Sequence, residues 1–404
     1  MRKLSSLIVI LVLTATTAFA GGYQVRLQGQ EQTTFGLIGT PMVFGSSGIF
    51  YNPGTLSFME NKYDFQVGAS FVMSKVTFQK DFTDYQAHTD NPIKPPPYAY
   101  GAMKINDKLT VGFGFYAPYG STTKWDDNWA GKMLIQNISL KAFYFQPTVA
   151  YKISDKLGIG VGLVYTKGDV VLQKGLPYSD DATATLEGTT SAWGYNIGLY
   201  YKFNEKLSFG IDYRSKVIMK MKDGTALFNI PTSLQTTVPP INTFNAELPM
   251  PANLDIGFAY KVNEKFTMAL ELGIVFWDVY QDLTFEFGEK GSLLNSVNPR
   301  KYSNTVITRI GGEYKFNEKW TFRAGAYYDP SPTNDDYFNP ETVSLNTLAF
   351  TLGATYTYDE HWLFTFSYLQ TNGLETKKSY LPNNFSGTYQ TVAYIPGIGI
   401  RYRF

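Results

Sequence analysis

The sequence contains no cysteine and only two histidines, and these scarcities exclude several classes of protein. Without cysteine, neither a disulfide framework nor a lipid anchor on a thiol can form. His88 stands in a polar stretch and His361 follows Glu360, and neither has a neighbouring serine motif. A Ser-His or Asp-His mechanism would therefore lack its base, so we do not expect an enzyme. Because metal, nucleotide and haem motifs are also missing from the sequence, we expect no metal and no cofactor.

The chain also lacks a basic excess and any long apolar run. The formal net charge is +1 at pH 7, so we expect no nucleic-acid partner. No segment is apolar over the ~20 residues that a membrane-spanning helix needs. What the chain has in abundance is Tyr (30), Phe (30) and Gly (36), which makes it far too aromatic for a disordered protein.

The first residues have the pattern of a secretory signal. Arg2 and Lys3 precede a short apolar core at residues 7–13, and Ala18-Phe19-Ala20 supplies the small residues of a signal peptidase site. An uncleaved membrane anchor is the alternative, but the apolar core is too short for a spanning helix. We therefore predict that residues 1–20 are a signal peptide, cleaved after Ala20, and that the protein is exported through the inner membrane.

One short pattern recurs six times along the rest of the chain. An aromatic residue or Met is followed, usually, by Lys, a β-former, a two-residue polar turn, and a new apolar alternation. Because Asn-Asp, Ser-Asp, Asn-Glu or Asp-Glu interrupts two alternating runs, each copy predicts the tip of a tight hairpin. Six short turns at one end require long loops at the other, which is the layout of a transmembrane β-barrel. The copies begin at Met103, Tyr151, Tyr201, Tyr260, Tyr314 and Tyr356.

Strands placed around these turns give an all-β fold, a 14-stranded antiparallel transmembrane barrel over residues 63–404 with both termini in the periplasm. The last strand alternates up to a terminal Phe404, as the closing strands of bacterial outer-membrane barrels do. We therefore expect the protein in the outer membrane of a Gram-negative bacterium, surrounded by outer-membrane lipid. We also expect the barrel assembly machinery to recognise the Phe404 strand.

Side chains alternate along a strand, so the pattern also predicts which residues face lipid. An Arg or Lys facing lipid at mid-bilayer would cost about 2–4 kcal/mol, so charges should point into the lumen, most of them pairing with one another there. In the strand that follows the Asn204-Glu205 turn, the seventh of the fourteen expected strands (strand 7), the expected lipid face is Leu207, Phe209, Ile211, Tyr213, Val217 and Met219. The expected lumenal residues of this strand are Asp212, Arg214, Lys216 and Lys220. Elsewhere the expected lumenal charges are Glu271, Arg309, Glu313 and Arg323.

The outer loops are expected to be long and to carry exposed apolar residues such as Ile241, Phe244 and Leu248. Such residues favour an apolar surface that captures hydrophobic ligands over a hydrophilic channel entrance. The expected loops are residues 76–96, 120–137, 173–190, 223–250, 287–301, 331–343 and 374–387.

Residues 21–62 precede the first strand and are too glycine-rich, polar and irregular to form another. A barrel of fourteen strands is wide enough to need either a water channel or a plug. We therefore predict an N-terminal hatch, at residues 21–62, inside the lumen. Glycines that face the lumen would make room for the hatch. They are Gly112 and Gly114 in the strand after the Asn106-Asp107 turn (strand 3), and Gly158, Gly160 and Gly162 in the strand after the Ser154-Asp155 turn (strand 5).

Short motifs in this segment and in several expected strands resemble those of one known protein family. Phe50-Tyr51-Asn52-Pro53-Gly54 stands where the family has an Asn-Pro-Ala hatch motif, and departs from it by one small residue. Further matches are Tyr119-Gly120, Tyr213-Arg214-Ser215, Glu247-Leu248-Pro249 and Asp329-Pro-Ser-Pro. The chain thus resembles the FadL/TodX family of outer-membrane transporters for long-chain fatty acids and other hydrophobic compounds.

The resemblance implies a mechanism as well as a fold. A hydrophobic ligand would be captured by the outer loops, released as the hatch (Asn52, Pro53, Gly54) shifts, and would leave sideways at a kinked strand 3. The kink would fall at Pro118, Tyr119 and Gly120, since Pro118 cannot donate a ladder hydrogen bond and Gly120 packs no side chain. The alternative is that these three residues merely begin an outer loop.

The resemblance also bears on the ligand's head group. Family members place a cation where this chain has Leu172, and Lys174 lies two residues on, on the same face. Lys174, Arg214 and Lys216 are then the candidate head-group residues for a fatty acid carboxylate. Because of the departure at Leu172, a neutral hydrocarbon stays open as cargo.

Long-chain fatty acid uptake is therefore the function that we expect, and two other functions stay open. A general or aromatic-hydrocarbon porin would use the same fold, and so would a mainly structural outer-membrane barrel. A general porin should keep an open aqueous lumen, whereas residues 21–62 are available here as a plug.

Overall fold

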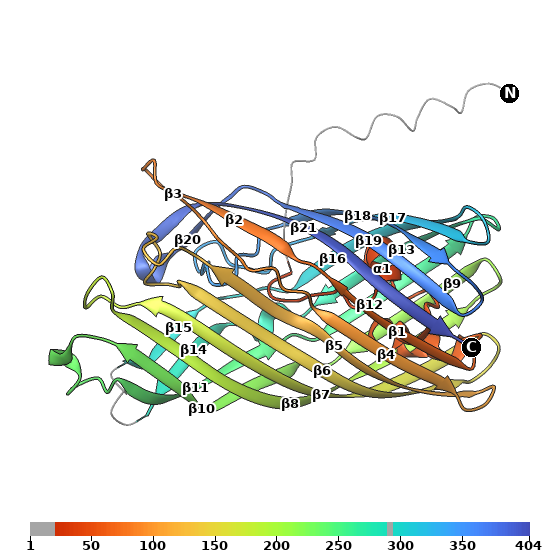
Figure 1. The fold of residues 1–404 in the computed structure, drawn as a ribbon, viewed down its shortest axis with the longest axis horizontal. Coiled ribbons are helices and arrows are strands. Elements are labelled where there is room, and N and C mark those ends of the chain that lie inside the picture. Colours follow the sequence, from red (N-terminus) through yellow and green to blue (C-terminus); the bar gives the residue numbers. More distant parts are fainter. Residues whose placement is uncertain (1–20, 289–293) are drawn as a thin grey trace, which may run out of the picture.

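The computed structural model describes residues 21–288 and 294–404. The predicted signal peptide, and residues 289–293 of the expected loop 287–301, lie outside the described residues. The described residues form a closed antiparallel barrel of fourteen strands, as the sequence predicted (Figure 1). The barrel closes because β1 (Tyr63–Ser70) pairs with β4 (Pro97–Lys104) on one side and β21 (Phe385–Arg403) on the other. No helix among the described residues is long and apolar enough to cross a membrane.

Six wall strands are interrupted, so each of them consists of two segments. These pairs are β1 and β2 (Met73–Lys80), β9 (Leu207–Arg214) and β10 (Val217–Asn229), β11 (Ile241–Met250) and β12 (Asn253–Lys261), β13 (Phe266–Val275) and β14 (Asp282–Phe287), β15 (Ser296–Pro299) and β16 (Thr305–Lys315), and β19 (Trp362–Gly373) and β20 (Thr376–Tyr380).

The other wall strands are continuous, and the short β3 (Gln86–His88) forms an outer hairpin with β2. The continuous strands are β4, β5 (Leu109–Lys124), β6 (Asn137–Lys152), β7 (Leu157–Gly175), β8 (Thr183–Lys202), β17 (Trp320–Asp329), β18 (Thr347–Thr357) and β21.

The six repeated turns lie together at one end of the barrel and share one local structure. In the first, Asn106 Oδ1 accepts hydrogen bonds from the backbone N–H groups of Lys108 and Leu109, both at 2.9 Å. Asn and Asp suit this position because their side chains bond to the main chain two or three residues on. The same arrangement recurs at Asn204, Asn263, Asn317 and Asp359, and with a serine hydroxyl at Ser154.

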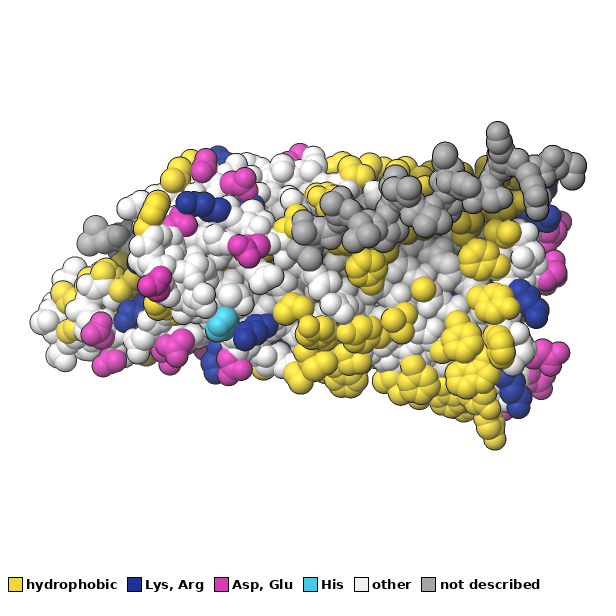
Figure 2. Space-filling model, turned by 90° about the horizontal axis from the view of Figure 1, so that it is seen from above, with side chains coloured by type: hydrophobic (Ala, Val, Ile, Leu, Met, Phe, Trp, Pro, Cys, Tyr) yellow, Lys and Arg dark blue, Asp and Glu magenta, His cyan; other side chains and the backbone are white. Residues whose placement is uncertain are grey.

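The outer wall carries an apolar belt between two charged ends (Figure 2). On β13, Met268, Leu270 and Leu272 are exposed to the surroundings, whereas Glu271 between them is fully buried. The inward placement of Arg309, Glu313 and Arg323 is likewise confirmed, because all three are buried. A barrel with an apolar exterior and charges sorted inward is what the bilayer requires.

The predicted facing is wrong for the second half of strand 7. Ser215 and Lys216 separate β9 from β10, and the break moves the alternation by one residue. Val217 and Met219 are therefore buried inside, whereas Lys216 and Lys220 are exposed. Lys220 forms a surface ion pair at 2.5 Å with Glu247 on β11. The alternation changes again at the register shift between Met221 and Gly224.

Several expected outer loops turn out to be partly strand, because the wall continues beyond the apolar belt. Residues 120–124 still belong to β5, and the expected loop 223–250 is a hairpin of β10 and β11. Of the apolar residues expected to be exposed there, Ile241 is exposed but Phe244 is buried. Leu248 is half-buried and lines an internal cavity. The exposed apolar surface of this outer hairpin is thus smaller than predicted, because Phe244 and Leu248 point inward.

Residues 21–62 fold inside the barrel as short helices and turns (Figure 1). Their helical segments are almost wholly buried against the inner wall. These elements are α1 (Gln30–Thr34), η1 (Gly45–Ser47), α2 (Gly48–Tyr51) and η2 (Pro53–Phe58). Outside the hatch, short 3-10 turns occur in the loops at η3 (Thr232–Leu234), η4 (Trp277–Val279) and η6 (Leu381–Asn383). We call residues 21–62 the hatch.

Deleting Phe404 should impair assembly of the barrel. Phe404 and Tyr63 exchange backbone hydrogen bonds of 3.1 and 2.8 Å across the closing seam, and their rings stack at 4.6 Å. The deletion removes these contacts and the end of the outward-facing row, so we expect less heat-modifiable barrel at unchanged synthesis. Phe82→Ala, at a fully exposed outer-loop ring, is the control. Normal amounts of heat-modifiable barrel in the deletion variant would contradict this role.

Candidate functional site

The hatch is held to the barrel by buried ion pairs. Arg26 of the hatch contacts Asp255 on β12 at 2.6 Å and Glu271 on β13 at 2.8 Å. Arg309 on β16 contacts the same two carboxylates at 3.1 and 3.2 Å. The other Glu271 oxygen accepts a hydrogen bond of 2.9 Å from the backbone N–H of Thr40. Because each charge has a partner of opposite sign, this cluster anchors the hatch to the wall.

A second ion cluster holds the other side of the hatch. Glu31 lies between Arg323 and Arg401, at 3.3 and 3.0 Å. Arg401 also contacts Asp64 on β1, at 2.7 Å, and Arg323 contacts Glu313, at 2.7 Å. Arg26 and Glu31 therefore connect the hatch to different strands of the wall. Neither residue stands out in the sequence, since a single charge in a polar segment indicates nothing about its partner.

The Asn52-Pro53-Gly54 turn is seated against the glycines that the sequence placed in the lumen. Asn52 Nδ2 donates to the carbonyls of Thr40 and Leu199, at 2.8 and 2.9 Å, and its Oδ1 accepts from Gly54 N at 2.9 Å. A Cβ added at Gly160 would lie 2.4 Å from Pro53, so only glycine leaves room for the turn. A Cβ at Gly54 would approach the wall backbone to 2.8 Å. The turn thus fits closely into the face of β7 and β8.

Strand β5 is continuous, but its pairing is interrupted at the predicted kink, and the hatch supplies backbone partners to this broken edge. The β5–β6 register shifts between Tyr116 and Tyr119. Val25 N donates to Pro118 O at 2.7 Å, and Gly120 N donates to Tyr23 O at 2.9 Å. Residues 23–25 therefore lie beside the broken edge as a short antiparallel partner, with Gln24 opposite Tyr119.

Gln28 completes this substitute pairing through its side chain. Its Nε2 donates to Ala117 O at 2.7 Å, and its Oε1 accepts from Ala117 N at 3.3 Å. One amide side chain thus satisfies both backbone groups of a kink residue, which matters because unpaired backbone groups are costly away from water. Sequence reasoning missed Gln28 because the amide's partner is 89 residues away.

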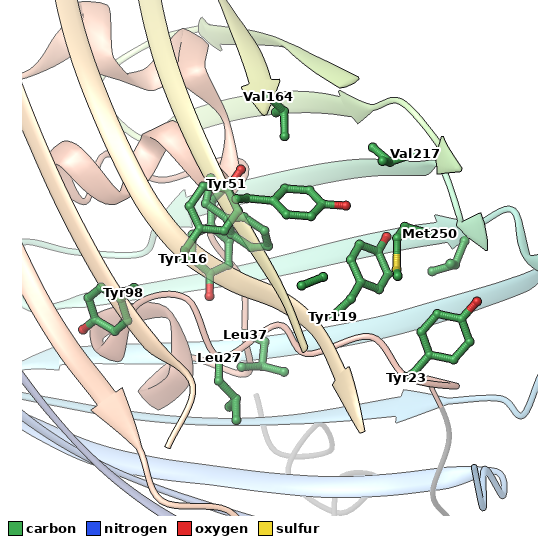
Figure 3. Packing of buried hydrophobic residues seen from close by; sticks show 14 of the residues in the cluster. Tyr23, Leu27, Leu37, Tyr51, Tyr98, Tyr116, Tyr119, Val164, Val217 and Met250 are labelled. Atoms are coloured by element: carbon green, nitrogen blue, oxygen red, sulfur yellow. The ribbon is translucent and has the colours of Figure 1, made fainter. Parts of the chain in front are cut away.

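A cavity of about 580 Å³ lies at the kink and reaches from the lumen to the outer wall. Its inner part is lined by Leu27 and Leu37 of the hatch, which pack side by side (Figure 3). Its outer part is lined by Gly120 and by Lys141 and Phe143, which alternate with the buried, inward residues of β6. The same space is therefore bounded by interior and exterior residues at a place where strand pairing is lost.

A narrow apolar chamber of about 70 Å³ adjoins the wall cavity and shares Leu140, Lys141 and Thr342 with it. Its lining is almost entirely apolar, and Met219, Met221 and Met250 are part of it. Because Met side chains are flexible, such a lining can re-pack around ligands of different shape. Met250 lies beside Tyr119 and near Tyr23, so hatch, kink and chamber meet at one place (Figure 3).

A space of about 80 Å³ adjoins the chamber and is lined by further charged groups. Lys174 and Arg300 line it, together with Glu341, which also lines the chamber. Arg300 is buried and contacts Glu341 at 2.6 Å. Leu172, at the position where the resemblance implies a cation, lines both spaces. Lys174 and Arg300 therefore lie beside the apolar chamber, whereas Lys141, which lines the chamber itself, is paired with Asp169 at 3.0 Å. Sequence reasoning missed Arg300 because it lies in an expected outer loop.

The three candidate head-group cations occupy different environments. Lys174 lines the space beside the chamber, whereas Lys216 is exposed and does not face the lumen, because of the break after β9. Arg214 is buried, and it donates to Phe50 O at 2.6 Å and to Tyr116 Oη at 2.8 Å. The arginine therefore ties the hatch to β5. The structure brings none of the three cations together.

The described residues contain no group of three or more His, Cys, Asp or Glu side chains that could hold a metal ion. Neither histidine lines the chamber. His88 stands in the β2–β3 hairpin, and His361 is in a short turn.

Comparison with known proteins identifies the family. The family model described as outer membrane protein transport protein (OMPP1/FadL/TodX) matches residues 11–404. The chain is 25% identical to a 47 kDa outer membrane protein of Pasteurella multocida, over 87% of each chain. It is 23% identical to a long-chain fatty acid transport protein of Escherichia coli O6:H1, over 88% of each chain.

Solved structures show the same fold. A FadL homologue of Pseudomonas aeruginosa matches 95% of this chain and 100% of its own, with a TM-score of 0.82 at 18% identity. The Ralstonia pickettii toluene transporter TbuX matches 94% of this chain and 99% of its own, with a TM-score of 0.74 at 19% identity. The chain belongs to the OMPP1/FadL/TodX family of outer-membrane transport proteins, which are transporters and not enzymes.

Replacing Asn52 and Pro53 together with Ala should loosen the hatch and leave the barrel folded. The change removes Asn52 as a partner of two buried carbonyls, at a cost of ~1–3 kcal/mol for each group left unsatisfied. The strand ladders are untouched, so heat modifiability should be normal, while hydrogen exchange in residues 40–56 rises and uptake changes.

Asn204→Ala is the matched control, because Asn204 makes the equivalent side-chain bonds in a short turn that does not contact the hatch. If hydrogen exchange and uptake in the Asn52/Pro53 variant equal those of wild type, at equal amounts of protein in the outer membrane, the turn does not hold the hatch in position.

Proposed function

We propose that this protein takes up hydrophobic compounds across the outer membrane, with long-chain fatty acids as the preferred cargo. In this proposal the outer loops capture the ligand, the hatch moves, and the ligand leaves sideways at the kink of β5. The observation that carries the proposal is the wall cavity, because hatch residues and outward-facing wall residues line one continuous space at that kink.

The interior supports an apolar cargo. The lining of the chamber offers methionine, leucine and phenylalanine side chains and little polar surface. An apolar ligand gains ~25 cal/mol for each Å² that it removes from water, so lipid is a better destination for it than the periplasm. A passage through the wall at Gly120 would deliver such a ligand directly into the bilayer.

A carboxylate at one end of the cargo is supported by Lys174 and Arg300. Arg300 is already paired with Glu341, and Lys141 with Asp169, so among the described residues that line the two spaces Lys174 is the cation without an ion pair. A carboxylate ligand would contact Lys174 and compete with Glu341 for Arg300, since Arg binds carboxylates through two parallel hydrogen bonds. The fatty acid transporters among the relatives make this the first choice of cargo.

A neutral aromatic hydrocarbon is the second candidate cargo. Leu172 lines the chamber where the resemblance implies a cation, so part of the head-group site is apolar in this chain. Structures of similar fold include toluene transporters of Ralstonia pickettii and Pseudomonas putida. A neutral ligand would leave the Arg300–Glu341 pair intact.

Filling the wall cavity should block uptake of either cargo. Gly120→Ile places a β-branched side chain into the cavity, and Pro118→Thr offers a strand-forming residue with a backbone N–H at the kink. We expect both variants to lose most uptake, measured with labelled oleate and labelled toluene and normalised to folded barrel in the outer membrane.

Gly312→Val is the matched control, because a Cβ at Gly312 meets its nearest neighbour, Phe266, only at an ordinary 3.4 Å. Loss of oleate uptake alone would favour the fatty acid as cargo, and loss of both would favour a shared exit. Wild-type rates for both compounds in both variants would overturn the lateral route and favour an axial channel.

A further inference from the structure

The barrel wall has a second place where strand pairing is interrupted, between β11 and β14. These two segments share only three residue pairs, and the last of them joins Ala246 to Phe285. Pairing of the same two wall strands resumes only with β12 and β13. Within the described part of the chain, no ladder pair joins residues 247–251 to residues 277–284. We call this interruption the β11–β14 gap.

The β11 side of the gap is built so that it needs no partner strand. Pro249 and Pro251 lie there, and proline has no backbone N–H to leave unpaired. The Tyr23 hydroxyl donates to the Pro249 carbonyl. Tyr119 Oη donates to the Pro251 carbonyl at 2.9 Å. Because Tyr119 is a kink residue and Tyr23 pairs with the kink, two hydroxyl groups connect the gap to the interruption at β5.

A single layer of strand separates the chamber from an outer groove of about 710 Å³ at the gap. Successive residues of β11 line the two spaces in turn. Glu247 and Pro249 line the groove, whereas Leu248 and Met250 line the chamber. On β14 the groove residues are Asp282, Thr284 and Glu286, and the chamber residues are Leu283 and Phe285.

Met221 on β10 lies at the boundary, because it lines both the groove and the chamber. Its side chain is buried, and the register of β10 with β11 shifts directly after it, between Met221 and Gly224. A methionine side chain is unbranched and flexible, so it can change rotamer without breaking a ladder hydrogen bond. A movable side chain and an interruption in backbone pairing thus stand between the outside and the chamber.

We propose that the β11–β14 gap is an entry passage through which uncharged apolar ligands reach the chamber. The groove is lined by two cations and four carboxylates, namely Lys220, Lys222, Asp223, Glu247, Asp282 and Glu286. Lys220 is already paired with Glu247, so the remaining groups carry an excess of negative charge. This excess repels the carboxylate of a fatty acid and leaves an uncharged hydrocarbon unaffected.

The passage rests on the proposed function and divides it between two routes. An anionic ligand arrives from the outer loops and is received beside Lys174, whereas an uncharged ligand enters through the gap. Both leave at the β5 kink, so a difference in uptake between the two classes arises at entry.

The test joins the two edges of the gap with a reversible disulfide. Continuing the β11–β14 register places Glu247 opposite Thr284, directly beyond the last ladder pair. Opposed Cα atoms lie ~4.5–5.5 Å apart, within the range of a disulfide, so the test variant is Glu247→Cys with Thr284→Cys. Thr225→Cys with Thr243→Cys is the matched control, because these exposed residues oppose each other in the β10–β11 ladder and line neither space.

The measurement is uptake of labelled toluene and labelled oleate by cells, before and after oxidation, normalised to folded barrel in the outer membrane. We expect oxidation of the test pair to remove most toluene uptake and to leave oleate uptake unchanged, and reduction to restore toluene uptake. Oxidation of the control pair should change neither. If oxidation does not join the test pair, a short bis-maleimide bridges the same two cysteines.

Unchanged toluene uptake in the joined protein would overturn the proposal. An equal loss of toluene and oleate uptake would overturn it as well, because the passage would then not separate uncharged from anionic ligands. If the wild-type and the reduced proteins take up neither compound, the proposed function itself fails, and this route fails with it.

Discussion

The structure depends on how the broken edge of β5 obtains hydrogen-bond partners. A strand edge in a bilayer has no water to satisfy its N–H and C=O groups, so an opening in the wall of a barrel requires a substitute. Here residues 23–25 supply two backbone hydrogen bonds to Pro118 and Gly120, and the Gln28 side chain supplies two more to Ala117. The hatch is therefore part of the wall as well as a plug.

This double role links the hatch to the wall cavity. The residues that pair with β5 are followed directly by Arg26, whose two carboxylate partners lie on β12 and β13, and by Leu27, which lines the wall cavity. A ligand that displaces Tyr23 or Leu27 would therefore weaken the pairing at the kink. Buried ion pairs at Arg26 and Glu31 would keep the rest of the hatch in place, because breaking them leaves unpaired buried charges.

Much of the fold could be predicted from local sequence patterns. The contacts of the hatch and the lining of the chamber could be predicted only in part. The six turns were predictable because an Asn, Asp or Ser side chain closes each one locally, and the charges of β13, β16 and β17 were predictable from alternation. The alternation failed at Ser215-Lys216 because the two-residue break inverts the facing of the side chains that follow, up to the second register shift after Met221. Gln28, Glu31 and Arg300 could not be predicted, since their partners are distant in the sequence and no local pattern marks them.

The most direct test of the account is a reversible crosslink between the hatch and β5. Gln24 and Tyr119 oppose each other as a non-hydrogen-bonded pair, for which Cα atoms lie ~4.5 Å apart, within the range of a disulfide. The chain has no cysteine of its own, so Gln24→Cys with Tyr119→Cys gives a single possible bond. The account predicts that uptake of labelled oleate stops when the pair is oxidised and returns on reduction. Equal uptake by the fully oxidised and the reduced protein would contradict it.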